Sequence, residues 1–423
     1  MARILVWTSP ARGHLFPVLP VADELHARGH EVQVRTLADE VGMVRARGLT
    51  AQAIPAEVEA IALDDWRART TPGALAASVK AFGARAAFDA AAATEAIAQW
   101  RPDVVIADIN AWGAMAAAER WGGPWATFAP YPLVLASPDV PPFGPGWAPA
   151  RTTAQRLRDR VMRPVITGGM ERTMRPPLNA VRRSVGLAPL ASIDDLVLRA
   201  PLVISMTAEP FEYPRAHWPS SVVMVGPCAF EPPLSAAGGE APADVLDAVR
   251  DRGRPVVLVT TSSEFQDDGR LVDAALEALA DEDVTVVATV PSGDRDVRAV
   301  PANAVVVRYA PHSALLPHAV VAVTHGGLGA TQKALAHGVP VVAVPFGRDQ
   351  FEVARRVEVA GAGVRLPARR LRPDRLGDAV ARARTMTAGA RRVAAGFTAA
   401  GGAGAAADAV EARLVAASVP PPG

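Results

Sequence analysis

The chain has 423 residues, of which 50% are hydrophobic and 21% are charged, with 44 basic and 43 acidic side chains and a formal charge of +1. This length suggests two or three domains, and the near-neutral charge gives no electrostatic reason to expect nucleic acid or an anionic membrane as a partner. The single cysteine, Cys228, excludes an intrachain disulfide framework and a multi-cysteine metal site, and it fits a reducing cytoplasm.

Strand and helix patterns alternate through the first half of the chain. Short apolar runs rich in β-branched residues predict strands, and segments with helical spacing predict helices between them. From 138 to 189 the pattern breaks up into proline, glycine and arginine. The expected strands are 3–8, 31–37, 50–54, 104–107, 125–128, 202–205 and 222–225, and the expected helices are 17–28, 74–99 and 111–121.

A segment rich in proline and glycine, 227–243, separates this half from a second alternating half and is the expected linker. The pattern then gives strands at 255–260, 284–290, 304–308, 319–324 and 339–344, helices at 270–280 and 329–337, and helices onward to the end. We therefore predict an α/β protein with two doubly wound, Rossmann-like domains, 1–226 and 244–423, facing across a cleft. The final helices are candidates for packing back on the first domain.

A glycine-rich turn between a buried strand and a helix gives the clearest chemical signal. It follows Val323 and Thr324 and contains His325, Gly327 and Gly329. Free N–H groups at a helix start bind anions, and glycine lets a phosphate approach the backbone closely. His325 is placed to donate a hydrogen bond to the same anion. The alternative is an ordinary glycine turn with a surface histidine.

Two polar residues, Asp349 and Gln350, follow the next strand and suit a polyhydroxylated ligand. Because ligands of open α/β sheets bind outside the carboxyl ends of the strands, this position favours a sugar contact. The alternative is that Asp349 caps the helix that follows.

In the first half, a histidine follows the first strand and a carboxylate ends another strand of the same sheet. His14 precedes a helix opened by Pro17, and a helix N-terminus disfavours imidazolium, so we expect a neutral ring that can accept a proton. Asp108 would hold the tautomer of that base and stabilise its charged form. The alternatives are a structural histidine and an aspartate that caps the next helix.

Several cofactor sites are poorly supported by the sequence. The first turn lacks the Gly-x-Gly-x-x-Gly pattern of nicotinamide dehydrogenases, and the turn after His325 misses its third glycine. The acidic pairs Asp281/Asp283 and Asp294/Asp296 fall in charged, loop-like stretches, and no His-Glu-x-x-His zinc pattern occurs. We therefore predict no metal and no bound cofactor.

Taken in order, these motifs resemble those of one enzyme family. The blocks are Tyr309-Ala-Pro-His312, His-Gly-Gly-x-Gly from His325, Gly-Val-Pro from Gly338, and Asp-Gln from Asp349. They resemble the family 1 glycosyltransferases of GT-B fold, within the UDP-glycosyltransferase superfamily. The resemblance is particularly to the bacterial natural-product branch, which acts on macrolides, enediynes and other polyketides. It extends over nearly the whole chain.

The resemblance implies inverting transfer of a sugar from a nucleoside diphosphate to a hydroxyl of an apolar natural-product aglycone in antibiotic-type metabolism. The partners would be these two small molecules, and neither nucleic acid nor a membrane. His14 would be the catalytic base, Asp108 its partner, domain 1–226 the acceptor side and domain 244–423 the donor side. The donor-binding residues implied are Ser262, Ser263, Tyr309, Ala310, His325, Gly326, Gly327, Leu328, Gly329, Ala330, Thr331, Asp349 and Gln350.

The chain departs from the family pattern at four positions. Ala330 replaces threonine or serine, so its phosphate contact would be the backbone N–H alone, or Thr331 substitutes. Tyr309 replaces the tryptophan that stacks on the base, and His312 replaces glutamine. Lys333 stands where many members carry the glutamate that binds the ribose hydroxyls. Lysine cannot accept a hydrogen bond, which predicts a preference for dTDP sugars over UDP sugars, unless Lys333 points into solvent.

All eight tryptophans lie at or before Trp218, which favours the first domain as the side that binds an apolar acceptor. The expected pocket residues are Trp66, Phe82, Trp112, Phe143 and Trp147.

Two other functions would share the diphosphate site. A nucleotide-sugar epimerase of GT-B fold would act without an apolar acceptor. A non-catalytic glycosyltransferase helper would keep the diphosphate site and lose the base, and the presence of both His14 and Asp108 argues against it. The oligomeric state stays open, with a homodimer as one alternative.

Overall fold

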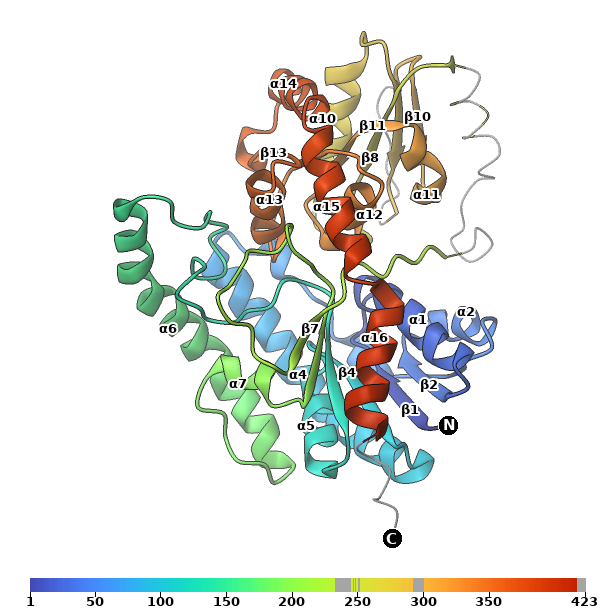
Figure 1. The fold of residues 1–423 in the computed structure, drawn as a ribbon, viewed down its shortest axis with the longest axis vertical. Coiled ribbons are helices and arrows are strands. Elements are labelled where there is room, and N and C mark those ends of the chain that lie inside the picture. Colours follow the sequence, from blue (N-terminus) through green and yellow to red (C-terminus); the bar gives the residue numbers. More distant parts are fainter. Residues whose placement is uncertain (233–244, 246, 248, 250–251, 292–299, 417–423) are drawn as a thin grey trace.

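The computed structural model describes all residues except 233–244, 246, 248, 250–251, 292–299 and 417–423. Two parallel sheets, one in each half of the chain, lie one above the other in Figure 1. Each sheet is flanked by helices, as the alternating pattern predicts. The expected linker is described only up to residue 232, so its remaining part lies outside the described residues.

The N-terminal half contains a seven-stranded sheet with the order β3-β2-β1-β4-β5-β6-β7. Its strands are β1 (Arg3–Trp7), β2 (Glu31–Thr36), β3 (Thr50–Ala53), β4 (Val104–Asp108), β5 (Trp125–Ala129), β6 (Leu202–Ser205) and β7 (Val222–Met224). Its helices are α1 (Arg12–Ala27), α2 (Val41–Arg45), α3 (Ala56–Ala60), α4 (Thr71–Trp100), α5 (Trp112–Trp121), α6 (Thr153–Ser184) and α7 (Ile193–Leu198).

The C-terminal half contains a six-stranded sheet with the order β10-β9-β8-β11-β12-β13. Its strands are β8 (Val256–Thr260), β9 (Thr285–Thr289), β10 (Ala304–Val307), β11 (Ala319–Thr324), β12 (Val341–Ala343) and β13 (Gly363–Arg365). The helices are α10 (Arg270–Leu279), α11 (His312–Leu315), α12 (Leu328–Ala336), α13 (Gln350–Val359), α14 (Pro373–Arg384), α15 (Thr387–Ala399) and α16 (Gly402–Val410).

Strand order reverses once in each sheet, between β1 and β4 in the first and between β8 and β11 in the second. Such a switch point opens a crevice at the carboxyl ends of the strands, because the connections on either side run to opposite faces. His14 follows β1 and Asp108 ends β4, whereas Ser262 follows β8 and His325 follows β11. The topology therefore places all four residues at switch points.

Two expectations about helices are wrong. The segment after residue 138 is not irregular throughout, because it contains the 32-residue helix α6, which begins with a capping box between Thr152 and Gln155 and contains three prolines. Helix α1 begins at Arg12 and not at Pro17, so His14 lies in its first turn. The short strand β13 also lies in a region where only helices were expected.

The last two helices connect the halves, as Figure 1 shows in red. Val393 and Phe397 of α15 belong to an apolar cluster of the C-terminal half, and Ala406 and Val410 of α16 to one that contains β1, β2 and β4. Between the helices the backbone turns at Gly401, whose φ of +83° favours glycine. By its contacts, α16 thus belongs to the N-terminal half.

Among the described residues, one helical segment passes a test of length and apolarity for crossing a membrane, Thr387–Val415. It consists of α15, α16 and the turn that follows them. The two helices of this segment pack on different halves of the protein, and 28% of the tested window is buried.

Candidate active site

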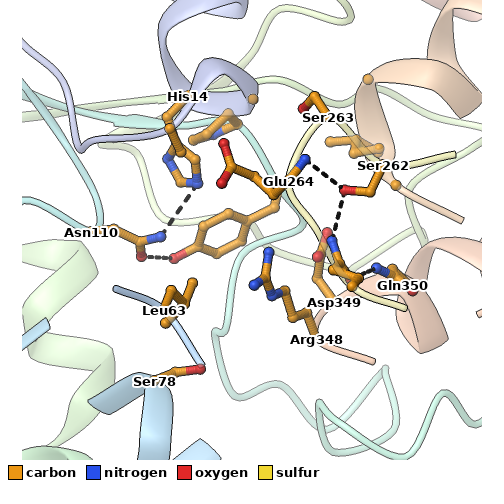
Figure 2. Close-up of a pocket in the computed structure, with 18 of the residues that line it drawn as sticks. His14, Leu63, Ser78, Asn110, Ser262, Ser263, Glu264, Arg348, Asp349 and Gln350 are labelled. Carbon is orange, nitrogen blue, oxygen red and sulfur yellow. Dashed lines mark hydrogen bonds between the residues drawn. The ribbon is translucent and has the colours of Figure 1, made fainter. Parts of the chain in front are cut away.

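A cavity of about 1970 Å³ lies between the two halves and is lined by both of them. The N-terminal half contributes the start of α1, and the C-terminal half contributes the loop after β8, the start of α12 and the loop after β12. Figure 2 shows His14 and Asn110 on one side of this space, with Ser262, Arg348 and Asp349 on the other. The cavity is therefore the predicted cleft, with both predicted site clusters on its walls.

The structure brings the proposed base and its partner into direct contact. Nδ1 of His14 lies 2.7 Å from Oδ2 of Asp108, and the carboxylate is 2% exposed. Since a carboxylate can only accept, the proton lies on Nδ1 and leaves Nε2 as the atom that can take a proton. The pair has the arrangement of a general base and its orienting acid.

Asp108 does not cap the next helix with its side chain, which was the alternative. Helix α5 has Ala111 at its N-cap position and no side-chain cap. The second carboxylate oxygen of Asp108, Oδ1, accepts a hydrogen bond from the backbone N–H of Asn110 at 2.9 Å. Both oxygens are therefore used to hold the carboxylate towards His14.

The pKa of His14 is raised above its usual value of 6.5. Burial lowers it, but the charge of Asp108 and its hydrogen bond to the ring outweigh burial, and Asp349 and Glu264 add to the increase. This direction is opposite to the expectation from sequence, in which the helix N-terminus disfavours the imidazolium. The carboxylates that surround the ring dominate its pKa.

We expect kcat/KM to fall as the pH is lowered, because only neutral His14 can accept a proton. The raised pKa places this decrease above pH 6.5, with full activity above the pKa and loss below it. A pH profile of kcat/KM for wild type and for Asp108→Asn checks this. Removing the carboxylate should move the residual decrease to lower pH, and an unchanged midpoint would contradict the assignment.

The glycine-rich turn has the geometry expected of an anion site. Helix α12 begins at Leu328 with Gly327 at its N-cap, and no side chain caps it, so the first N–H groups of the helix stay available. The His325 ring lies against Gly327, where an added Cβ would come within 2.2 Å of Nε2, so a larger residue would displace the ring. Burial lowers the pKa of His325 to about 4, so the ring is neutral and carries one N–H at neutral pH.

Two of the expected donor-binding residues, Gly326 in the turn and Thr331 on α12, do not line the cavity. The Thr331 side chain is fully buried and its hydroxyl lies 3.2 Å from that of Thr324, so the idea that it replaces a missing hydroxyl at Ala330 is wrong. Gly326 lies behind the turn against Gln350 and is not part of the lining. The cavity is lined here by His325, Gly327, Leu328, Gly329 and Ala330.

The two predicted sugar contacts that follow β12, Asp349 and Gln350, differ in their hydrogen bonds. Asp349 occupies the N-cap position of α13 but its side chain makes no cap hydrogen bond, so the capping alternative is not realised. Gln350 instead accepts from the backbone N–H groups of Phe346 and Gly347 and donates to Gln266 at 2.5 Å. Gln350 therefore shapes this loop, with one amide N–H left over.

The serines after β8 also differ in their contacts. Ser262 is 4% exposed, and its hydroxyl accepts from the backbone N–H of Glu264 and from the side chain of Gln266. Ser263 lies on the cavity wall with an exposed side chain. Ser262 thus organises the loop that lines the cavity.

An ion pair that the sequence did not predict joins the two halves at the cavity. Arg348 donates two hydrogen bonds to the carboxylate of Asp65, at 2.8 and 2.7 Å, and Asp65 is 4% exposed. Next to it, the rings of Trp66 and Phe265 meet edge to face at 4.9 Å between centroids. These contacts hold the short turn Asp65–Arg67 of the first half against the loops of the second half that contain Phe265 and Arg348.

The expected nucleotide end of the cavity carries a second unpredicted pair. Nζ of Lys333 lies 3.5 Å from Oε1 of Glu231, and both side chains line the cavity. Lys333 therefore does not point freely into solvent. Tyr309 donates its hydroxyl to the carbonyl of Pro232 at 2.9 Å, and Ala310 lies beside it on the wall.

Four of the five expected acceptor-pocket aromatics line the cavity, namely Trp66, Phe82, Trp112 and Phe143. Phe82 and Trp112 meet edge to face with their centroids 5.6 Å apart. Trp147 is not part of the lining, so this expectation is wrong. The guanidinium of Arg158 stacks on Trp147 at 4.2 Å from its ring centroid.

Within the described ranges, no group of three or more histidine, cysteine or acidic side chains could hold a metal ion. The pair Asp281/Asp283 belongs to this described part, whereas Asp294/Asp296 lies outside it.

The sequence and the fold match known glycosyltransferases. Residues 273–412 match the family model described as erythromycin biosynthesis protein CIII-like, C-terminal domain. The chain is 35% identical over 385 residues to 4'-demethylrebeccamycin synthase of Lentzea aerocolonigenes, covering 88% of this chain and 89% of that protein. It is 28% identical to demethyllactenocin mycarosyltransferase of Streptomyces fradiae, covering 84% and 74%.

Among solved structures, the calicheamicin glycosyltransferase CalG4 superposes with a TM-score of 0.72 at 22% identity, covering 98% of both chains. Glycosyltransferase VinC, in complex with dTDP, gives a TM-score of 0.72 at 23% identity and covers 98% of this chain and 99% of that one. These likenesses establish the two-domain GT-B fold. With the sequence match over most of both chains, they show that this chain belongs to the bacterial natural-product glycosyltransferases.

Proposed function

We propose that this glycosyltransferase moves a sugar, often a deoxysugar, from a dTDP-linked donor to a hydroxyl of an apolar natural-product aglycone, with inversion at the anomeric carbon. One observation carries the proposal: His14 and the start of α12 face the same cavity from different halves of the protein. A base for an acceptor and a site for a departing diphosphate are the two groups that such a transfer needs.

In the proposed reaction, the acceptor oxygen forms a bond to the anomeric carbon while its proton passes to Nε2 of His14. The bond between that carbon and the diphosphate oxygen breaks, and its electron pair leaves with the diphosphate. Asp108 stabilises the imidazolium, and the N–H groups of α12 with His325 meet the growing charge of the leaving group. Asp349, with no cap bond of its own, is the candidate for the sugar hydroxyls.

The apolar aromatics on the first half support an apolar acceptor. A GT-B epimerase binds no apolar acceptor, so these aromatic side chains would have no ligand to contact. The proposal includes a cytoplasmic location, two small-molecule substrates without nucleic acid or membrane as partners, and a homodimer as one alternative for the assembly.

A screen of nucleotide sugars against a panel of hydroxylated aglycones tests the function. We expect glycosylated product, detected by mass, from at least one aromatic or polyketide-like aglycone, with no change of sugar configuration when the acceptor is omitted. Epimerised nucleotide sugar formed without acceptor would instead support the epimerase.

The proposed preference for dTDP rests on the Glu231–Lys333 pair. Lys333 cannot accept a hydrogen bond, and Glu231 already accepts from Lys333 and from the backbone N–H and hydroxyl of Ser313. Few acceptor sites are then left for the two vicinal hydroxyls of ribose, whereas deoxyribose has one hydroxyl to satisfy. The dTDP bound to VinC, a relative in fold, agrees with this preference.

Competition between dTDP and UDP for the ligand-free protein measures that preference. We expect dTDP to bind more tightly by about tenfold, the size of one hydrogen bond. Lys333→Gln adds an acceptor oxygen at this position and should narrow the difference. Equal or tighter binding of UDP by wild type would contradict the argument.

His325→Ala is expected to weaken the binding of nucleoside diphosphate by between about tenfold and 100-fold, because it removes a hydrogen bond to a charged group. Calorimetry with dTDP and with the acceptor separates the effects, and acceptor affinity should stay near that of wild type. His337→Ala, at the exposed far end of α12, is the matched control. Unchanged dTDP affinity in His325→Ala would exclude the phosphate contact.

A further inference from the structure

Two polar side chains next to His14 have no part in the transfer as described so far. The side-chain nitrogen of Asn110 lies 3.3 Å from Nε2 of His14, and the hydroxyl of Tyr131 donates to Oδ1 of the same amide at 2.8 Å. Figure 2 shows the Asn110 amide turned towards the ring. Because Asp108 occupies Nδ1, Asn110 lies where an acceptor hydroxyl has to arrive.

The donors and acceptors in this chain of hydrogen bonds follow from the groups at its two ends, Asp108 and Tyr131. Asp108 can only accept, so Nδ1 of neutral His14 carries the proton and Nε2 carries a lone pair. A lone pair at Nε2 requires a donor opposite it, so the amide nitrogen of Asn110 faces the ring and its Oδ1 faces Tyr131. Burial raises the pKa of Tyr131 well above its usual value, so its hydroxyl keeps the proton that it donates to Oδ1. The amide nitrogen of Asn110 is then the end that faces His14, and it donates into the Nε2 lone pair.

We propose that Asn110 is a positioning residue of the base, whose amide fills the Nε2 lone pair until an acceptor hydroxyl replaces it; this rests on the proposed transfer function. Donation into Nε2 stabilises the neutral ring in the tautomer that a base needs. At 3.3 Å the contact is longer than a typical N–H hydrogen bond, so exchange for a hydroxyl costs little.

Asn110 and the charged groups around the ring have opposite effects on the pKa of His14. The charged groups that face His14 are Asp108 at the end of β4, and Asp349 and Glu264 from the second half, and each of them favours the imidazolium. An amide that donates to Nε2 favours the neutral form. In the absence of acceptor, Asn110 thus keeps the base ready despite the surrounding carboxylates.

Tyr131 links this arrangement to the contact between the two halves. Its side chain packs against apolar clusters of both the first and the second sheet. Its ring also meets the edge of the His14 ring, with the centroids 6.0 Å apart. The position of the Asn110 amide therefore depends on a side chain that both halves hold in place.

The test replaces the amide by a carboxylate of the same size. In Asn110→Asp an acceptor-only group faces Nε2 and favours the imidazolium, so the decrease of kcat/KM at low pH should move to higher pH by about one unit or more. Activity should recover at high pH. The 15N resonances of His14 in the ligand-free protein, assigned by comparison with His14→Ala, should titrate with the same upward shift.

Two further variants sharpen the result. Ser78→Asp adds the same charge to another part of the cavity wall, away from His14 in Figure 2, and should leave the His14 titration near that of wild type. Tyr131→Phe frees the amide to turn its oxygen towards Nε2, so it should give a smaller shift in the same direction as Asn110→Asp. Loss of the tyrosine hydroxyl leaves the apolar contacts of the ring in place.

An unchanged titration of His14 in Asn110→Asp would overturn the proposal, as would an equal shift in Ser78→Asp. The titration needs no donor or acceptor, so it tests Asn110 even if wild type transfers no sugar. Failure of transfer by wild type with every donor would count against the proposed function, and not against the contact between Asn110 and His14.

Discussion

His14→Ala is expected to lower kcat by on the order of 100-fold or more, which corresponds to about 2.7 kcal/mol of transition-state stabilisation. The reason is that the cavity loses the group at which the acceptor proton would arrive, Nε2, while the diphosphate site on α12 is untouched. Steady-state kinetics with a saturating donor measure the effect. Calorimetry should give an affinity for dTDP close to that of wild type.

A structural role for His14 would give a different pattern. The side chain of a histidine that only fills space could be replaced by one of similar size, so His14→Gln would then retain most of the turnover. We expect His14→Gln to be as inactive as His14→Ala, because glutamine cannot accept a proton at neutral pH.

Asp108→Asn is the second substitution with a large expected effect, on the order of 100-fold or more in kcat with the fold intact. An asparagine can donate its amide hydrogen to Nδ1 of His14, which places the ring proton on Nε2. The base then presents a proton to the acceptor in place of a lone pair. The kinetics should be measured over a range of pH, together with far-ultraviolet circular dichroism.

Asp89→Asn is the matched control for this substitution. Asp89 is a buried carboxylate of the same half, 2% exposed, and burial raises its pKa to about 7. It accepts a hydrogen bond from the indole N–H of Trp7 at 3.1 Å and makes no hydrogen bond to His14. Above pH 7, where the Asp89 carboxylate is mostly ionised, its loss of charge should leave turnover within a few-fold of wild type. Equal losses in both variants would indicate a general electrostatic effect of the first half.

Most strands were predictable because the burial of a strand in a parallel sheet is visible in its sequence as a short apolar run. β1, β8 and β11 are short, mostly buried apolar runs in the middle of their parallel sheets, and no helix among the described residues has that pattern. Helix α6 was missed because Pro164, Pro176 and Pro177 interrupt its sequence. The capping box at its start, Thr152 with Gln155, was the signal that could have found it.

The site was partly predictable for a topological reason. His14, Asp108 and His325 each follow or end a strand next to a switch point. Ligands of such sheets bind at the carboxyl ends of these strands, so the topology alone predicts that these residues belong to a site. The same rule could have found Asn110, two residues after β4, and Tyr131, two residues after β5. Neither belongs to a motif, so sequence alone gave no reason to single them out.

The pairs Asp65–Arg348 and Glu231–Lys333 were not predictable. Their members are separated by 283 and 102 positions. Asp65 and Arg348 come together only because the two halves close on each other, whereas Glu231 lies in the described part of the linker and meets Lys333 of α12 there. No periodicity or spacing in one half encodes a partner in the other. Asp349 and Glu264, which add to the increase in the pKa of His14 caused by Asp108, come from the second half and were missed for the same reason.

The most direct test of the account is whether the release of nucleoside diphosphate depends on a hydroxylated acceptor and on His14. Wild type with a dTDP sugar and a hydroxylated aglycone should release dTDP and form one glycoside of inverted anomeric configuration. Omitting the acceptor, or replacing His14 by alanine, should lower the rate of release by on the order of 100-fold. Release at the wild-type rate without an acceptor, or by His14→Ala with one, would contradict transfer through the His14–Asp108 pair.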